Sequence, residues 1–343
     1  MSEVDVVIGD RTLAPGKPIY VIAEIGSNHN QDKARALDMI AQSAECGADA
    51  VKFQSLRFDR MYLPENESED FRKWYQAIEL DESWYHDLAK AAADAGVDFL
   101  SAPCYPQSVP LLEAVGVPAY KLGSSQVQGD PRTIRAVAQT GKPIIMSAGY
   151  CEKTDLERAL ALCAEEGNRQ IVILHCVSKY PAEFSDCNLH FMTTLSETFG
   201  LPVGLSDHTP GGHLAVTSVA LNCCVIEKHV TDDKSLDGPD HHFALNFEEF
   251  ARMTGDIRDI ESAMGSSAWP TLPPEVQNLR RRYRYKAFAA EDVKAGELIP
   301  FAAYRSENYD DAFSADAPHL ATARASKDIA KGQPILADCI DDD

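Results

Sequence analysis

The sequence predicts a (β/α)8 barrel of the TIM type followed by a small β-rich domain. Eight short apolar runs recur between residues 21 and 226, segments with 3.6-residue periodicity separate most of them, and a polar or charged residue closes each run. Strands that alternate with helices form parallel sheets, and eight repeats favour a closed barrel over an open sheet. No Gly-x-Gly-x-x-Gly motif follows the first run, which argues against a dinucleotide fold.

The expected elements follow in order along the chain. A hairpin over 4–8 and 12–14 comes first and is placed to close the bottom of the barrel. The eight strands are expected at 21–23, 50–51, 99–100, 119–120, 144–146, 172–174, 203–205 and 225–226. Helical periodicity is clear over 34–44 and 156–163, and a helix with Phe247, Phe250, Met253 and Ile257 on its apolar face follows the last strand. The barrel domain is therefore assigned to residues 1–265.

Three further segments depart from the barrel repeat. The interval 55–83 is long and aromatic, as lids and substrate-recognition loops often are. Residues 266–284 are rich in proline and arginine and are expected to form a linker. Residues 285–343 contain two turns of the form Asp-Val/Ile-x-x-Gly-Glu/Gln, which predicts a compact β-rich domain.

Composition restricts the partners and the compartment. The formal net charge is −21, so the average surface repels phosphate backbones and anionic lipid, and neither nucleic acid nor a membrane is an expected partner. No apolar stretch approaches the ~18 residues that span a bilayer, and the N-terminus lacks the features of an export signal. The nine cysteines are scattered without a Cys-x-x-Cys pair, which predicts reduced thiols and a cytoplasmic protein.

Two histidines follow the last two expected strands. His208 and His229 each have acidic neighbours, and the ends of adjacent strands meet at one rim of a barrel. Each ring alone is more simply explained as a hydrogen-bonded barrel residue, but the pair favours a metal site. Two imidazoles without thiolates leave positions for water and substrate, which suits an open site holding Mn²⁺, with Mg²⁺ or Co²⁺ as alternatives.

Lysines, serines and glutamates end the other strands. Lys52 and Lys121 would be costly inside a barrel without anionic partners, so each either pairs with a carboxylate or receives an anionic ligand. Hydroxyls of the kind that surround a phosphoryl group follow other strands: Ser124, Ser147, Ser178 and Ser206. Glu24 and Glu227 are either partners of the lysines or groups that orient a hydroxyl and transfer protons.

Six motifs in order resemble the sialic acid (N-acetylneuraminate) synthase family over nearly the whole chain. They are IAEIGSNH at 22–29, VKFQ at 51–54, YKLGS at 120–124, LHCVSKYP at 174–181, GLSDHT at 204–209, and EKH at 227–229 with GPDH at 238–241. The segment from residue 285 is similar to the antifreeze-like (SAF) domain of that family. The resemblance implies condensation of phosphoenolpyruvate with an open-chain N-acylated hexosamine and water, giving a nine-carbon 2-keto-3-deoxy acid and phosphate by C–O cleavage.

The resemblance also implies roles for individual residues. His208 and His229 would hold the divalent metal, and Glu24 and Glu227 join them as candidate catalytic groups, with Glu24 the candidate for proton transfer at the attacking water. The candidate phosphoenolpyruvate-binding residues are Lys52, Lys121, Ser124, Ser147, Ser178 and Ser206. The candidate sugar-binding residues are Glu24, Gln54, Asn66, Tyr180 and Asp240. Arg305 would reach the site of the partner in a domain-swapped homodimer.

Departures from the family pattern leave the sugar open. Ser-Ala-Pro-Cys at 101–104 stands where the family usually has Ser-Thr-Pro-Phe, Ser125 and Gln126 replace Gly-Glu, and the Pro-Gly turn after Arg305 is absent. A sibling synthase for legionaminic, pseudaminic or another acyl sugar acid is therefore an alternative. Two others are a metal aldolase that uses pyruvate and a barrel without turnover that binds sugar phosphates in polysaccharide assembly.

Overall fold

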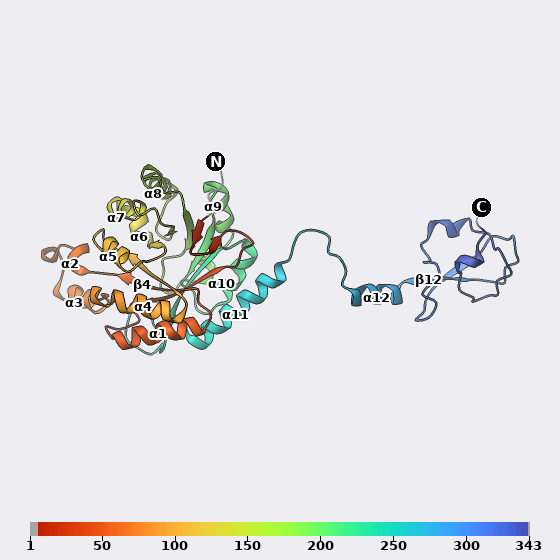
Figure 1. The fold of residues 1–343 in the computed structure, drawn as a ribbon, viewed down its shortest axis with the longest axis horizontal. Coiled ribbons are helices and arrows are strands. Elements are labelled where there is room, and N and C mark those ends of the chain that lie inside the picture. The colour runs from red at the N-terminus through yellow and green to blue at the C-terminus, as the bar shows by residue number, and fades with distance from the viewer. Residues whose placement is uncertain (1–5, 342–343) are drawn as a thin grey trace. The chain divides into compact units, whose positions relative to one another are not determined.

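The computed structural model describes residues 6–341, and the chain divides into two compact units (Figure 1). The first unit ends at Gly265 and the second begins at Ser266. Among the described residues, no helix is long and apolar enough to cross a bilayer.

Eight parallel strands form the nearly closed barrel that the sequence predicts. They are β3 (Tyr20–Gly26), β4 (Ala50–Ser55), β5 (Asp98–Pro103), β6 (Tyr120–Leu122), β7 (Ile144–Ser147), β8 (Ile171–Cys176), β9 (Val203–Asp207) and β10 (Val225–Thr231). Their order in the sheet is β5-β4-β3-β10-β9-β8-β7-β6, and β5 contacts β6 where the circle closes. All eight expected apolar runs lie in these strands or, for 119–120, at the start of one.

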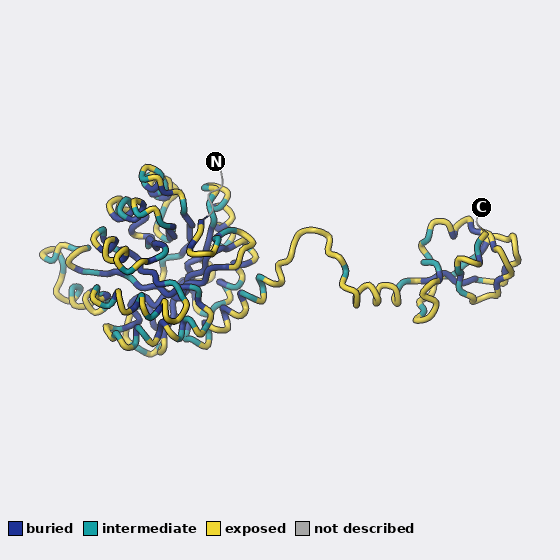
Figure 2. The backbone as a smooth tube through the Cα atoms, viewed as in Figure 1, coloured by how far each residue is buried: buried dark blue, intermediate teal, exposed yellow. Residues whose placement is uncertain are grey.

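Helices surround the barrel and bury one face each, so that the strands are dark blue and the outer helix faces yellow in Figure 2. The apolar outer face of the strands packs against inward residues such as Ile40, Leu88 and Ile257 in one continuous core. The helices are α1 (Lys33–Glu45), α4 (Tyr85–Ala95), α5 (Ser108–Ala114), α6 (Ser124–Gly129), α7 (Pro131–Ala138), α8 (Lys153–Glu165), α9 (Phe191–Phe199), α10 (His213–Ser218) and α11 (Phe247–Met264). Shorter elements are the 3-10 turns η3 (Phe184–Asp186) and η4 (Val219–Leu221) and strand β11 (Leu245–Asn246), which pairs with β10.

An N-terminal hairpin closes one end of the barrel. Strands β1 (Val6–Ile8) and β2 (Arg11–Leu13) pair antiparallel, with Val6 opposite Leu13. Val6, Ile8 and Leu13 pack against inward residues near the starts of the barrel strands, which leaves the carboxyl ends as the open side. The expected hairpin is confirmed over these residues; its first two positions, Val4 and Asp5, lie outside the described residues.

The long interval 55–83 is helical rather than an open loop. It contains α2 (Phe58–Met61), η1 (Pro64–Asn66), α3 (Glu69–Ala77) and the start of η2 (Glu82–Trp84). The helices are held by a small aromatic core in which the Phe58, Tyr62, Phe71 and Tyr75 rings lie 5.1–6.2 Å apart between centroids. Such a core gives the segment a fixed shape beside the open end of the barrel.

The second unit begins with a helix and continues as a compact β-rich fold. Helix α12 (Pro274–Tyr283) occupies most of the segment expected as a linker, because Pro274 stands at its first position and no glycine interrupts it. Strands β12 (Tyr285–Ala289) and β13 (Phe301–Arg305) pair antiparallel, and η5 (Pro318–Ala321) and η6 (Ala337–Cys339) follow.

The two repeated turns of this unit face each other reciprocally. Val293 bridges Ile329, the Asp292 carboxylate accepts from the Lys331 N–H at 2.7 Å, and the Asp328 carboxylate accepts from the Ala295 N–H at 3.1 Å. The compact β-rich region predicted from these turns is therefore present.

Candidate active site

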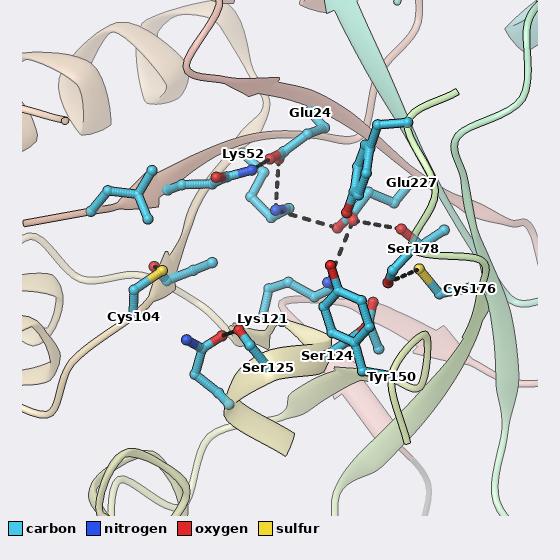
Figure 3. A pocket seen from close by; sticks show the side chains of 18 of the residues that line it. Glu24, Lys52, Cys104, Lys121, Ser124, Ser125, Tyr150, Cys176, Ser178 and Glu227 are labelled. Carbon is cyan, nitrogen blue, oxygen red and sulfur yellow. Dashed lines mark hydrogen bonds and ion pairs between the residues drawn. The ribbon is translucent and has the colours of Figure 1, made fainter. Parts of the chain in front are cut away.

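A polar cavity of about 280 Å³ opens at the carboxyl ends of the barrel strands (Figure 3). Twelve of the predicted site residues line it: Glu24, Lys52, Gln54, Lys121, Ser124, Ser147, Ser178, Tyr180, Ser206, His208, Glu227 and His229. They come from seven strands or from the loops that follow them, because the carboxyl ends of the strands in a closed barrel share one rim. The predicted convergence on one site is therefore observed for these residues.

Two lysines and two glutamates form a buried charge cluster in the cavity. Register pairs Glu24 with Lys52 on neighbouring strands, and the Lys52 ammonium lies 2.7 Å from one Glu24 oxygen and 3.6 Å from Glu227. Lys121 reaches Glu227 from the far side of the barrel at 3.4 Å. All four side chains are at most 5% exposed. The lysines thus have carboxylate partners, but inside the cavity, where a ligand can compete for them.

The two carboxylates have pKa values displaced in opposite directions. Burial raises the pKa of Glu227, but Lys121, Lys52 and the Ser206 hydroxyl outweigh it and hold the pKa at about 2. For Glu24, burial and the charge of Glu227 outweigh Lys52, so its pKa is raised above 4.5. Neighbouring acids whose pKa values are separated in this way are suited to different roles, one as a fixed charge and one as a proton carrier.

Serine hydroxyls complete the polar side of the cavity. Ser206 donates to Glu227 at 3.0 Å, and Ser124 accepts from the Gly149 N–H at 2.9 Å. A Cβ at Gly149 would lie 2.1 Å from the Ser178 oxygen, so only glycine lets the backbone approach this closely. The Ser147 oxygen is buried without a hydrogen-bond partner among the described residues. A buried hydroxyl in this state is ready to donate to a ligand.

The two histidines face each other across adjacent strands. Their ring centroids are 5.4 Å apart, and Tyr180 covers His208 at 4.2 Å. His208 Nδ1 lies 2.9 Å from the Val177 carbonyl, so it carries the proton and leaves Nε2 as the free acceptor of the neutral ring. Burial, followed by nearby cations, holds the pKa of His229 well below 6.5, which keeps that ring neutral.

This pair fits the predicted divalent ion. His229 Nδ1 is buried without a hydrogen-bond partner, 3.6 Å from Asp240. Within residues 6–341, no group of three or more His, Cys, Asp or Glu side chains is arranged to hold a metal. The protein would therefore supply two imidazoles and leave the other positions to water and substrate, as open catalytic sites do. Burial lowers the pKa of His208, but the Cys176 thiol and the Val177 carbonyl raise it above 6.5, so protons would compete with metal at this ring.

Three predicted site residues lie outside the cavity lining. Asp240 is nearly buried beside it, and a Cβ at Gly26 would be 3.2–3.5 Å from Glu24, Gln54 and Asp240 together. Asn66 is exposed at the end of η1. Arg305 is exposed at the end of β13 in the second unit, with its guanidinium 5.0 Å from the Tyr285 ring centroid.

Several lining residues were not predicted as ligands. Tyr150 lies in the loop after β7 and turns its ring into the cavity (Figure 3), although 53% of it is exposed. Leu56, Met61, Tyr62 and Tyr75 come from the helical segment after β4, and Ala102 and Cys104 from the end of β5. Position alone could have indicated Tyr150, because it follows Ser147 by three residues.

The fold and this site define a TIM barrel with a buried lysine–glutamate cluster beside two imidazoles. The chain belongs to the NeuB family, whose profile matches residues 39–268. It is 36% identical over 296 residues to N,N'-diacetyllegionaminic acid synthase of Campylobacter jejuni, covering 82% of this chain and 88% of the relative.

Two solved structures resemble the chain in fold and sequence. The N-acetylneuraminic acid synthetase of Leptospira borgpetersenii, in complex with citrate, has a TM-score of 0.73 at 26% identity and covers 81% of this chain and 96% of its own. The spore coat polysaccharide biosynthesis protein SpsE of Bacillus subtilis has a TM-score of 0.68 at 31% identity, with coverage of 98% and 99%. The likeness to SpsE includes the second unit.

Proposed function

We propose that this protein is a nonulosonic acid synthase. It joins C3 of phosphoenolpyruvate to the aldehyde carbon of an open-chain N-acylated hexosamine, adds water at C2, and releases phosphate by cleavage of the C2–O bond. The product is a nine-carbon 2-keto-3-deoxy acid. The observation that carries the proposal is one cavity in which two buried lysines and an unpartnered serine hydroxyl lie beside a pair of imidazoles.

The lysine and serine side of the cavity suits phosphoenolpyruvate. Lys52 and Lys121 supply two charges, and Ser124, Ser147, Ser178 and Ser206 supply hydroxyls for the carboxylate and phosphate oxygens. A pyruvate-dependent aldolase would need no second anion site of this kind. Glu227 pairs with both lysines and neutralises the buried charges, and the anionic donor would compete with it for the two ammonium groups.

Glu24 and Glu227 divide the proton chemistry. Glu227 remains ionised and balances the two lysines, whereas Glu24, with its raised pKa, accepts the proton of the water that adds at C2. Gln54 donates to Glu24 at 2.6 Å and fixes the orientation of its carboxylate. His208 and His229 would hold Mn²⁺, or Mg²⁺ or Co²⁺, and when bound the ion would polarise the acceptor aldehyde.

Residues at the histidine side of the cavity are proposed to bind the sugar, and the second unit is proposed to act in a homodimer. Tyr180, Gln54 and Asp240 border the histidine side and are proposed to meet the sugar, as is Asn66 at the end of η1. The second unit is proposed to be an antifreeze-like domain that docks on the partner of a homodimer and supplies Arg305 to its site. The similarity to SpsE extends over the whole chain, so a second unit of this kind is shared by both proteins.

Coupled release of phosphate tests the proposed reaction. The full-length protein, loaded with Mn²⁺, would be given phosphoenolpyruvate labelled with oxygen-18 in the C2–O bond and a panel of N-acylated hexosamines. We expect one labelled phosphate for each 2-keto-3-deoxy acid formed, because C–O cleavage leaves the bridging oxygen on phosphorus. His208→Ala and His229→Ala should lose this activity, and His213→Ala, exposed on α10, should retain it.

The alternatives give different results in the same assay. A pyruvate aldolase would form product from pyruvate without phosphoenolpyruvate, and a binding protein would release no phosphate with any acceptor. Unlabelled phosphate from the labelled donor would show P–O cleavage and would also contradict the proposal.

A further inference from the structure

A buried histidine behind the cavity lining connects the loops that follow two strands of the site. His241 is 0% exposed, and its two ring nitrogens contact different segments. Nδ1 lies 2.7 Å from the Thr231 hydroxyl at the end of β10, and Nε2 lies 3.1 Å from the Asn30 side-chain oxygen in the loop after β3. Because β10 carries His229 and β3 carries Glu24, the ring links two strands of the site.

The hydrogen-bond partners of His241 fix the tautomer of its ring. The Asn30 amide nitrogen donates to the Asp237 carbonyl at 3.0 Å, which turns the amide oxygen toward His241. Nε2 therefore carries the proton and donates to Asn30, and Nδ1 accepts from the Thr231 hydroxyl. Burial lowers the pKa of His241, so the ring stays neutral and keeps both roles.

The backbone on both sides of the ring is shaped around it. Asn30 has a φ of 47°, in the left-handed region that is unfavourable for most non-glycine residues and that asparagine tolerates well. Gly238 lies against the imidazole, since a Cβ there would be 2.7 Å from the Cδ2 atom of His241. Only glycine therefore lets the backbone approach this ring so closely.

The turn over residues 238–244 brings two further side chains to the imidazole pair. After this turn the chain returns to β10 as β11. Asp240, one residue before His241, has its carboxylate 3.6 Å from Nδ1 of His229. Phe243, two residues after His241, is 4% exposed, and its ring centroid lies 5.1 Å from that of His229. A shift of the turn would therefore move both groups relative to His229.

We propose that His241 is a positioning residue that holds Asp240 and Phe243 in place beside the two imidazoles. This inference rests on the proposed function, because its effect is measured in the use of the acceptor. His241 does not line the cavity, so it acts through the turn rather than on a substrate. Loss of its hydrogen bonds to Thr231 and Asn30 would weaken the link between the two loops and let the turn move.

Steady-state kinetics with the full-length protein and Mn²⁺ tests the positioning role. The acceptor is the N-acylated hexosamine that the wild type uses best. His241→Leu should lower kcat/KM for this sugar by about 10- to 100-fold, the range found when groups that orient metal ligands are removed. KM for phosphoenolpyruvate should change by less than about twofold, because Lys52 and Lys121 lie on other strands.

Two further variants separate the hydrogen bonds from the bulk of the side chain. His241→Gln should recover most of the lost activity, because its amide can accept from Thr231 and donate to Asn30. His242→Leu is the matched control, since His242 is the exposed neighbour in the same turn, and it should behave as the wild type.

A change at Gly238 tests the same geometry with the imidazole present. Gly238→Ala places a methyl group against the ring and should reproduce the loss of acceptor use. Crystal structures of the wild type and of His241→Leu measure the geometry without turnover, and we expect Asp240 and Phe243 to be displaced from His229 in the variant. If His241→Leu does not fold, the structure of Gly238→Ala takes its place.

The outcomes separate this inference from the proposed function. Wild-type acceptor use by folded His241→Leu, an equal rise in KM for phosphoenolpyruvate, or equal losses in the Leu and Gln variants would overturn the positioning role. An unchanged turn in the variant structure would overturn it as well. Absence of phosphate release by the wild type would count against the synthase, and the crystal structures would still decide the role of His241.

Discussion

Glu24 and Glu227 show how one lysine can be shared by two carboxylates with different tasks. The folded pKa of Glu227 lies near 2, below its ordinary 4.5, so its contribution to the free energy of unfolding is complete above about pH 4.5 and lost as the pH falls toward 2. The contribution of Glu24 depends on pH in the opposite way. Because the pKa of Glu24 is raised in the folded protein, the free energy of unfolding falls as the pH rises through that pKa.

These signs give a prediction for two variants in urea unfolding. Glu227→Gln should destabilise the protein more at pH 6 than at pH 3, by roughly 2 kcal/mol, because at pH 3 Glu227 is already protonated in the unfolded chain while it stays ionised in the folded protein, so part of its stabilisation is lost. Glu24→Gln should show the reverse trend, since it removes a carboxylate that the fold disfavours. Parallel pH trends for the two variants would contradict the assignment of separate roles.

At the scale of elements, a buried ion pair holds the ends of β9 and β10 in place. Lys228 donates to Asp207 at 2.7 Å and to the Thr209 carbonyl at 2.5 Å, and Asp207 also accepts from the Thr209 N–H at 2.9 Å. Both charged side chains are fully buried. Because His208 lies between Asp207 and Thr209, and His229 follows Lys228, we expect this one pair to position both imidazoles.

We therefore expect Lys228→Met to lower the free energy of unfolding by about 3–5 kcal/mol, since it leaves the Asp207 carboxylate buried without its partner. Lys234→Met, which breaks the half-exposed pair with Glu249 nearby, should cost about 0–1 kcal/mol. Lys228→Met combined with Asp207→Leu should recover much of the stability but still bind Mn²⁺ more weakly by electron paramagnetic resonance. Wild-type Mn²⁺ affinity in the double variant would show that the pair does not position the rings.

The strands were predictable from sequence because each is buried on both faces and reads as a short apolar run with a polar end. The polar residues at the ends of these runs predicted the lysines, histidines and serines that line the cavity. The apolar part of the cavity lining was not predictable, since Leu56 and Tyr75 are also ordinary core residues and only tertiary packing shows which of their faces meets the cavity. Helix α12 was missed for a related reason: the surrounding prolines indicate a linker, while Pro274 is also a suitable first residue of a helix.

At the scale of the whole molecule, the second unit carries Arg305, which is proposed to act in the partner's site. The second unit has its own hydrophobic core of residues such as Val293, Ile299 and Ile329. Within residues 6–341, Arg305 has no carboxylate within ion-pairing distance, and its guanidinium lies over Tyr285 instead. A guanidinium displayed in this way is suited to pair with an anionic group outside its own unit.

If Arg305 acts in the partner's site, two inactive variants should restore activity when combined. Arg305→Ala and His208→Ala would be mixed as unfolded chains and refolded together. In a domain-swapped dimer, half of the products are mixed and each has one site free of both changes, so about a quarter of the wild-type phosphate release should return. Arg324→Ala, an exposed arginine of the same unit, is the control and should be active alone. No recovery in the mixture, with dimers confirmed by light scattering, would show that Arg305 does not act across the interface.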